Sequence, residues 1–138
     1  KDSFDFKLES VGVYGNNELV TLACSIIIFK LNNLSTIIDN GKLVINKSKV
    51  TLDNCFDIIL QNEDNTLGKL LEYVLYSLHF ENDKTLSYIA FKKLHPHDNS
   101  ALLRIAFKDP VEFLIIHDYL NNTINELKKI FNKIKTYF

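Results

Sequence analysis

Four histidines, two cysteines and 17 acidic residues are the side chains of this sequence that could bind a metal or catalyse a reaction. His95 and His97 flank Pro96, a spacing that could suggest metal ligands. No Cys-x-x-Cys pair and no helical His-x-x-x-His pair accompanies them, so no familiar zinc ligand set is complete. Asp53 and Asp57 could chelate an ion together, but a solvated position at a strand edge explains them better. The sequence therefore predicts no metal and no cofactor.

Catalytic motifs are not found in the sequence either. It contains no Gly-x-Ser-x-Gly elbow, no glycine-rich phosphate loop and no acidic triad suited to nucleotidyl transfer. Cys24 and Cys55 lie in apolar segments and are typical of core thiols in a reducing compartment. We expect His79 to complement a helix dipole at the helix end, and His117 to lie in a packed interface. A small enzyme built around Cys55 and the histidines is the least favoured hypothesis.

Composition indicates one compact domain. The chain has 138 residues, 46% of them hydrophobic, and a formal net charge of -1, so it has material for a core and no global basic field for nucleic acid. The C-terminal tail is basic, with Lys128, Lys129, Lys133 and Lys135. These lysines could attract the phosphates of nucleic acid, but the solvated face of a helix explains their spacing better. We expect no apolar run long enough to span a bilayer and no signal peptide. The chain opens at Lys1 and contains no methionine, so we expect a piece of a longer protein.

Hydrophobic spacing predicts three helices separated by strands. Phe4, Phe6 and Leu8 alternate with charged residues, as in a half-buried strand. From Glu18 the apolar residues recur every three or four positions up to Ile38, with enough of them for the helix to bury more than one side. Further strands are expected around residues 43–45, 56–60, 87–91 and 102–107, with a second helix starting near residue 67 and ending near residues 81–83.

The last helix has the most regular pattern. Asp109 can cap it, Pro110 suits its first position and Glu112 completes a capping-box spacing. Its apolar residues form a heptad seam that must face another helix: Phe113, His117, Leu120, Ile124, Leu127, Phe131, Ile134 and Phe138. We therefore expect an α+β fold in which three helices pack over one face of an antiparallel sheet.

Residues 62–71 carry the most informative motif, Asn-Glu-Asp-Asn-Thr-Leu-Gly-Lys-Leu-Leu. This stretch resembles the motif Glu-Asp-His-Thr-Leu-Gly-Asn-Leu-Leu of one family, the assembly subunits of multisubunit RNA polymerases represented by the eleventh subunit of eukaryotic polymerase II and the archaeal L subunit. It departs from that motif at Asn65 and Lys69. The matching residues are Glu63, Asp64, Thr66, Leu67, Gly68, Leu70 and Leu71.

Two other segments extend the resemblance. Pro96-His97 followed by Leu103-Arg104-Ile105 is similar to the downstream part of the same family, although Asp98 stands where that family usually has proline. Residues 4–12, followed by an apolar helix, resemble the third subunit of polymerase II or archaeal D near its carboxyl end. Both patterns on one chain resemble the fused subunit of some large nucleocytoplasmic DNA viruses. The resemblance implies a D-like strand and helix over residues 1–40 and an L-like domain over residues 41–138.

The resemblance also implies a fold, a role and partners. The fold would be the D/L dimerisation fold, an antiparallel sheet packed on long helices. The role would be a non-catalytic scaffold that binds the largest and second-largest polymerase subunits and small zinc-binding subunits, with no sequence-specific nucleic-acid contact and no membrane. A viral protein would act in the virion and in cytoplasmic viral factories, and a cellular one in the nucleus. The alternative is a freestanding homodimeric module that uses the heptad seam between chains.

The residue types of the motif suit the start of a helix. Asn65 or Thr66 can accept from the unpaired N–H groups of the first turn, and Glu63 and Asp64 favour its positive end. Gly68 costs up to about 1 kcal/mol relative to alanine in a helix. We therefore expect a close approach of other atoms at Gly68, and a turn that both caps the helix and contributes to the contact surface for the large subunits. The simpler alternative is a capped helix whose glycine only packs against the sheet.

Overall fold

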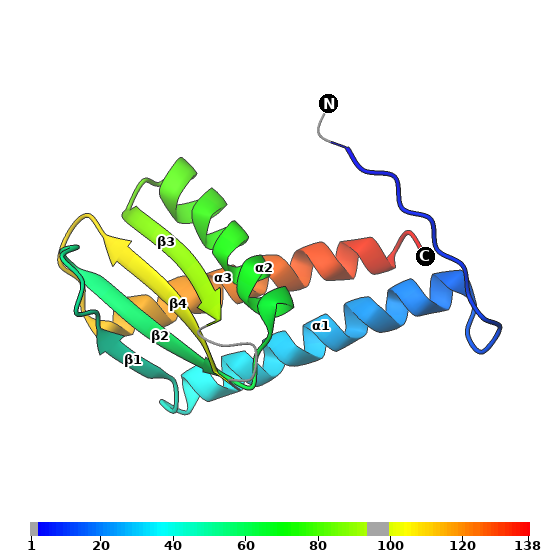
Figure 1. Cartoon of the computed structure of the whole chain (residues 1–138), viewed down its shortest axis with the longest axis horizontal. Helices are drawn as coiled ribbons and strands as arrows, with labels where there is room; N and C mark the ends of the chain where they lie inside the picture. The colour runs from blue at the N-terminus through cyan, green and yellow to red at the C-terminus, as the bar shows by residue number, and fades with distance from the viewer. Residues whose placement is uncertain (1–2, 94–99) are drawn as a thin grey trace.

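The structure, a computed structural model, describes residues 3–93 and 100–138. It is an α+β fold with a four-stranded antiparallel sheet and three helices, of which two are long and packed together (Figure 1). The helix α2 continues directly into a π-helical turn, η1. In chain order the elements are α1 (Asn16–Asp39), β1 (Val44–Lys47), β2 (Cys55–Gln61), α2 (Asn65–Leu75), η1 (Tyr76–Asn82), β3 (Leu86–Lys93), β4 (Ser100–Phe107) and α3 (Phe113–Lys135).

The sheet has the strand order β1-β2-β4-β3, and its neighbouring strands run antiparallel. In the two central strands, Ile58 lies opposite Leu103. Alternate residues of these strands point into the core, as the period of a half-buried strand requires. The buried set from β2 and β4 is Phe56, Ile58, Leu60, Ala101, Leu103, Ile105 and Phe107. The predicted strands at 56–60, 87–91 and 102–107 are confirmed, whereas the segment predicted at 43–45 pairs one residue later, from Val44 to Lys47.

The two long helices run antiparallel and lie side by side (Figure 1). Ser25 on α1 accepts a hydrogen bond from Lys135 on α3 at 2.9 Å, while Ser35 lies near Asn121 at the opposite end of the pair. From α1, Leu31, Leu34 and Ile38 enter the main core. The prediction that the first helix packs on the last is therefore confirmed.

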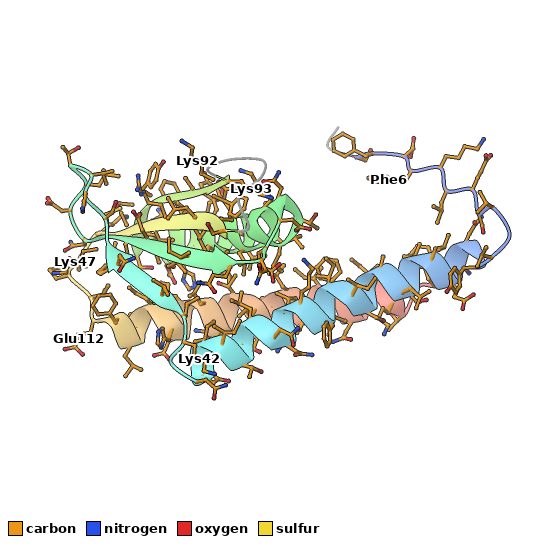
Figure 2. All side chains as sticks on the ribbon, turned by 60° about the horizontal axis from the view of Figure 1, so that its bottom comes forward. Phe6, Lys42, Lys47, Lys92, Lys93 and Glu112 are labelled. Atoms are coloured by element: carbon orange, nitrogen blue, oxygen red, sulfur yellow. The ribbon has the colours of Figure 1, made fainter. Side chains whose placement is uncertain are left out.

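The prediction for the N-terminal strand is wrong. Residues 3–11 form no strand, and this segment runs free of the sheet before α1 begins (Figure 1). Phe6 lies on it, apart from the sheet (Figure 2). The arm leads into the end of α1 that projects beyond the sheet, so it lies beside neither of the two edge strands, β1 and β3 (Figure 1).

The start of the last helix also differs from its prediction. Helix α3 begins at Phe113 with Glu112 as the N-cap residue, so Asp109 does not cap it and Pro110 is not its first residue. Glu112 is extended, with φ -85° and ψ 157°, and Val111 packs against the core. The connection from β4 must carry the chain from the sheet to the helix layer, and this delays the helix by about one turn.

Helix α1 corrects one further expectation. Over its 24 residues it is long and apolar enough to cross a membrane by length and composition alone, so the expectation that no apolar run reaches this length is wrong. One face of this helix packs against the rest of the chain, through Cys24, Leu31, Leu34 and Ile38. The expectation that this helix buries more than one side is wrong, because Ile26 and Phe29 lie on an exposed face.

Candidate assembly surface at the start of helix α2

The turn between β2 and α2 forms a well-defined helix start. Asn62 has φ 58°, a left-handed conformation that asparagine tolerates better than most residues. Asp64 is the N-cap, and its Oδ1 accepts hydrogen bonds from the N–H groups of Thr66 at 3.1 Å and Leu67 at 3.3 Å. The cap is therefore the aspartate of the motif, one residue before the predicted Asn65 and two before the predicted Thr66. Two of the four free N–H groups of the helix start are satisfied this way.

A lysine from α1 ties this turn to the first helix. Lys30 Nζ lies 3.0 Å from Glu63 Oε2 and 3.7 Å from Asp64 Oδ2. The hydrogen bond to Glu63 raises the pKa of Lys30. Burial alone would raise the pKa of Asp64, but the N–H groups of Leu67 and Thr66 and the charge of Lys30 lower it. Asp64 is therefore held in its ionised form beside the positive helix end, as its type indicates.

Gly68 lies directly beneath an aromatic ring. A Cβ at this position would stand 2.0–2.3 Å from three ring atoms of Phe91, far inside van der Waals contact. The N–H of Phe91 donates to Glu72 Oε1 at 3.1 Å, which fixes strand β3 against the helix. The predicted close approach is confirmed, and the approaching group comes from the same chain. Because Gly68 is buried, this residue is not itself available to a partner subunit.

The remaining motif residues divide into a core face and a free face. Leu67 and Leu71 are fully buried, and Leu70 is partly buried against the core. Asn65, Thr66 and Lys69 are exposed, and Asn65 and Lys69 are the two positions where the motif departs from its family. Next to them, an open cavity lies between α2 and β3, lined by Lys69, Glu72, Tyr73, Tyr76 and Ile89. This free face is the part of the motif that a partner can touch.

Arg104, from the downstream segment of the resemblance, stabilises the sheet. Its Nε and Nη2 donate to the two carboxylate oxygens of Asp57 at 2.6 and 2.8 Å, across the β2–β4 pair. The hydrogen bonds from Arg104 hold the pKa of Asp57 below its usual value, and those same bonds raise the pKa of Arg104. The expectation of a solvated Asp57 is wrong, because this carboxylate is partly buried in a two-pronged ion pair.

The heptad seam of α3 is internal only at its centre. Leu120, Ile124 and Leu127 are buried in the main core. His117, Phe131 and Ile134 are half-buried, while Phe113 and Phe138 at the two ends are exposed. The actual buried line also includes Ile116 and Thr123, because a straight helix with 3.6 residues per turn drifts from a strict heptad.

The histidines have varied surroundings. His79 lies in the last turn of η1, as expected, but it is buried there, with Nδ1 2.6 Å from Asp83 Oδ2 and its ring 4.1 Å from that of Tyr119. In the sequence, only the four-residue spacing between His79 and Asp83 could have indicated that these two side chains pair. His95, Pro96, His97 and Asp98 lie outside the described residues, so the expectations for them stay predictions.

Within the part of the chain that the structure describes, the candidate cysteines and histidines lie apart from one another. Cys24 and Cys55 are free and buried, as predicted, and burial raises the pKa of the Cys55 thiol. Cys55 and His79 line two different cavities. Among residues 3–93 and 100–138, no three histidine, cysteine or acidic side chains converge in a way that could hold a metal ion.

Comparison of the chain with protein-family models finds no match, and comparison with curated proteins also finds none.

Proposed function

We propose that this chain is a non-catalytic assembly subunit of a DNA-directed RNA polymerase that combines a D-like helix with an L-like domain. In this role it binds the largest and second-largest subunits, with small zinc-binding subunits joining the same assembly. The site of contact is the free face at the start of α2: Asn65, Thr66 and Lys69.

The observation that carries this proposal is that different residues of the segment 63–71 have different structural roles at one helix start. Three of the residues shared with the polymerase motif have a structural role at one helix start: Glu63 and Asp64 hold Lys30, Asp64 caps, and Gly68 admits Phe91. The leucines at 67 and 71 fill the core. A match that coincides with a complete local structure supports a shared fold, because capping alone would not require the glycine and the leucines.

The packing of α1 on α3 favours the fused subunit over a homodimer built on the heptad seam. The three central seam residues, Leu120, Ile124 and Leu127, are buried within the chain. A second copy would therefore find only the exposed ends of that seam. In a fused subunit, by contrast, the contact between the D-like and L-like helices is intramolecular.

Affinity purification of the tagged full-length protein from cells that produce it, followed by mass spectrometry of the co-purifying chains, tests the proposal. We expect the two largest polymerase subunits among them. Thr66→Arg, which places a large cation on the free face, is expected to reduce their recovery at an unchanged melting temperature. Thr51→Arg, at an exposed loop position, is the matched control and should retain them. Recovery without any polymerase subunit would reject the proposed function.

A further inference from the structure

The N-terminal arm, residues 3–9, has the pattern of a strand without a partner strand in the described residues. Phe4 and Phe6 are 83% and 93% exposed, and Leu8 is 45% exposed. On the opposite face of the alternation stand Asp5, Lys7 and Glu9, with Lys7 and Glu9 paired at 2.8 Å. Large aromatic side chains at this exposure mark a contact surface.

Helix α1, which follows the arm, also has an uncovered apolar face. Leu22, Ile26 and Phe29 are 41%, 58% and 64% exposed, and their spacing of four and three residues places them on one side of the helix. The buried residues of α1, such as Leu31 and Ile38, lie on the other side. A helix that is apolar all round is normally covered all round. The arm and this stripe are therefore two apolar surfaces, on consecutive segments of the chain, that are uncovered among the described residues.

We propose that two copies of the chain pair through their arms as an antiparallel ribbon with its two-fold axis at Phe6. In this register Phe4 lies opposite Leu8 of the second copy, and Phe6 lies opposite itself. Asp5 lies opposite Lys7 on the other face of the ribbon, twice by symmetry. The interface is thus self-complementary, as a two-fold contact must be.

Charge selects this register over its neighbours. Centring the ribbon on Lys7 would set Lys7 against Lys7 and Asp5 against Glu9, and centring it on Asp5 would set two aspartates together. Like charges directly opposite each other destabilise a strand pair. A shift by a single residue would place Phe6 opposite Lys7 and mix the apolar and charged faces.

The backbone is compatible with the same arrangement. The carbonyl of Leu8 accepts a hydrogen bond from the Asn16 side chain at 3.2 Å, so it points away from the partner strand. Since alternate residues point to opposite edges, the backbone groups of Asp5 and Lys7 are directed to the other edge and can pair with the second copy. A two-stranded ribbon is marginal alone. The α1 stripes of both copies offer the apolar surface on which its six apolar side chains can pack.

Cysteine cross-linking of the isolated chain tests the register. Opposed residues of a non-hydrogen-bonded pair have Cα atoms about 4.5 Å apart, within disulfide range, so Phe6→Cys should form a covalent dimer on mild oxidation. Phe4→Cys is the matched control, because its two copies would lie about 14 Å apart at four residues of strand rise. Equal cross-linking of both variants, or of neither, would overturn the proposal.

Charge exchange gives a second test by sedimentation equilibrium. Lys7→Asp should weaken the dimer by about tenfold, because it places like charges opposite each other twice. The double variant Asp5→Lys/Lys7→Asp should restore it, and Lys42→Asp, at a distant exposed lysine, should leave it unchanged. A monomer at all soluble concentrations, or a dimer indifferent to Lys7→Asp, rejects the ribbon. These tests use the isolated chain, so they are independent of whether polymerase subunits co-purify.

Discussion

The ring of Phe91 fills the space in which a side chain at Gly68 would begin, with ring atoms 2.0–2.3 Å from the position of that missing Cβ. This contact joins the helix start of the polymerase-like motif to the edge strand β3. Phe91 is buried, and its N–H is held by Glu72 one turn further along the helix. The ring therefore has little room to move aside.

Gly68→Ala is accordingly expected to destabilise the fold by about 1–3 kcal/mol, the usual cost of overpacking a core. Helix propensity alone predicts the opposite sign, a gain of up to about 1 kcal/mol. Urea denaturation measures the free energy of unfolding of both proteins. Gly15→Ala is the control, since a Cβ there meets open space, and its effect should stay within about 1 kcal/mol.

A double-mutant cycle would assign this cost to the ring itself. In a Phe91→Leu background the added methyl group meets a smaller and more adaptable side chain, so Gly68→Ala should cost less than it does in the parent. Contacting residues typically show coupling free energies of about 0.5–3 kcal/mol. Strict additivity of the two substitutions would mean that Phe91 is not what requires a glycine.

The contact also illustrates what the sequence can and cannot predict. A glycine in the first turn of a helix indicates close packing, but nothing in the sequence names Phe91, which lies 23 positions downstream, as the neighbour. Strand β2 was predictable because Phe56, Ile58 and Leu60 recur at every second position of a short apolar segment. The pairing of Asp57 with Arg104 depends on the strand register, which a single sequence does not contain.

The N-terminal arm also shows a limit of prediction from sequence: the pattern of a strand does not determine whether that strand pairs. The alternation of Phe4, Phe6 and Leu8 predicts a strand, but whether it pairs depends on a free edge in the right place. The free edges of the sheet belong to β1 and β3, and the arm lies apart from both, at the end of α1 that projects beyond the sheet (Figure 1). The helix cap was placed one or two residues too late because aspartate, asparagine and threonine are all good caps, and only the backbone conformation decides between them.

Asp64→Ala is expected to lower the free energy of unfolding by about 0.5–2 kcal/mol through loss of the N-cap. Its carboxylate holds the N–H groups of Thr66 and Leu67, and no other side chain of the motif takes over these bonds. Asn65→Ala is the informative control, because the sequence alone predicts Asn65 as a possible N-cap whereas the structure has Asp64 in that position. A larger effect at residue 65 than at residue 64 in chemical denaturation would contradict the observed cap.

Both thiols should be protected until the protein unfolds. Cys24 and Cys55 are each 5% exposed, and burial raises the pKa of Cys55, so its reactive thiolate is scarce. We expect labelling by an aromatic disulfide reagent to be slow in buffer and complete in concentrated urea. Single variants Cys24→Ala and Cys55→Ala assign the signal to each site. Rapid labelling of Cys55 in the native chain would contradict this prediction and would support the hypothesis of a reactive cysteine.

The Asp57–Arg104 pair predicts how stability depends on pH. Arg104 lowers the pKa of Asp57 in the folded chain relative to about 3.9 in an unfolded one. The pair therefore contributes fully above that unfolded value, and its contribution is lost as the pH falls through the lower, folded-state pKa, because only then does the native carboxylate take up a proton.

Asp57→Asn should cost about 1–3 kcal/mol at neutral pH, since it leaves a partly buried guanidinium without its charged partner. It should also flatten the loss of stability below about pH 4, measured by urea denaturation at a series of pH values. Asp64 and Asp83, whose pKa values are also lowered, will retain part of that slope. Asp53→Asn, in the exposed loop before β2, should change the neutral-pH value by less than about 0.5 kcal/mol. If Asp57→Asn and the parent lose stability in parallel on acidification, the ion pair is not the source of the acid sensitivity.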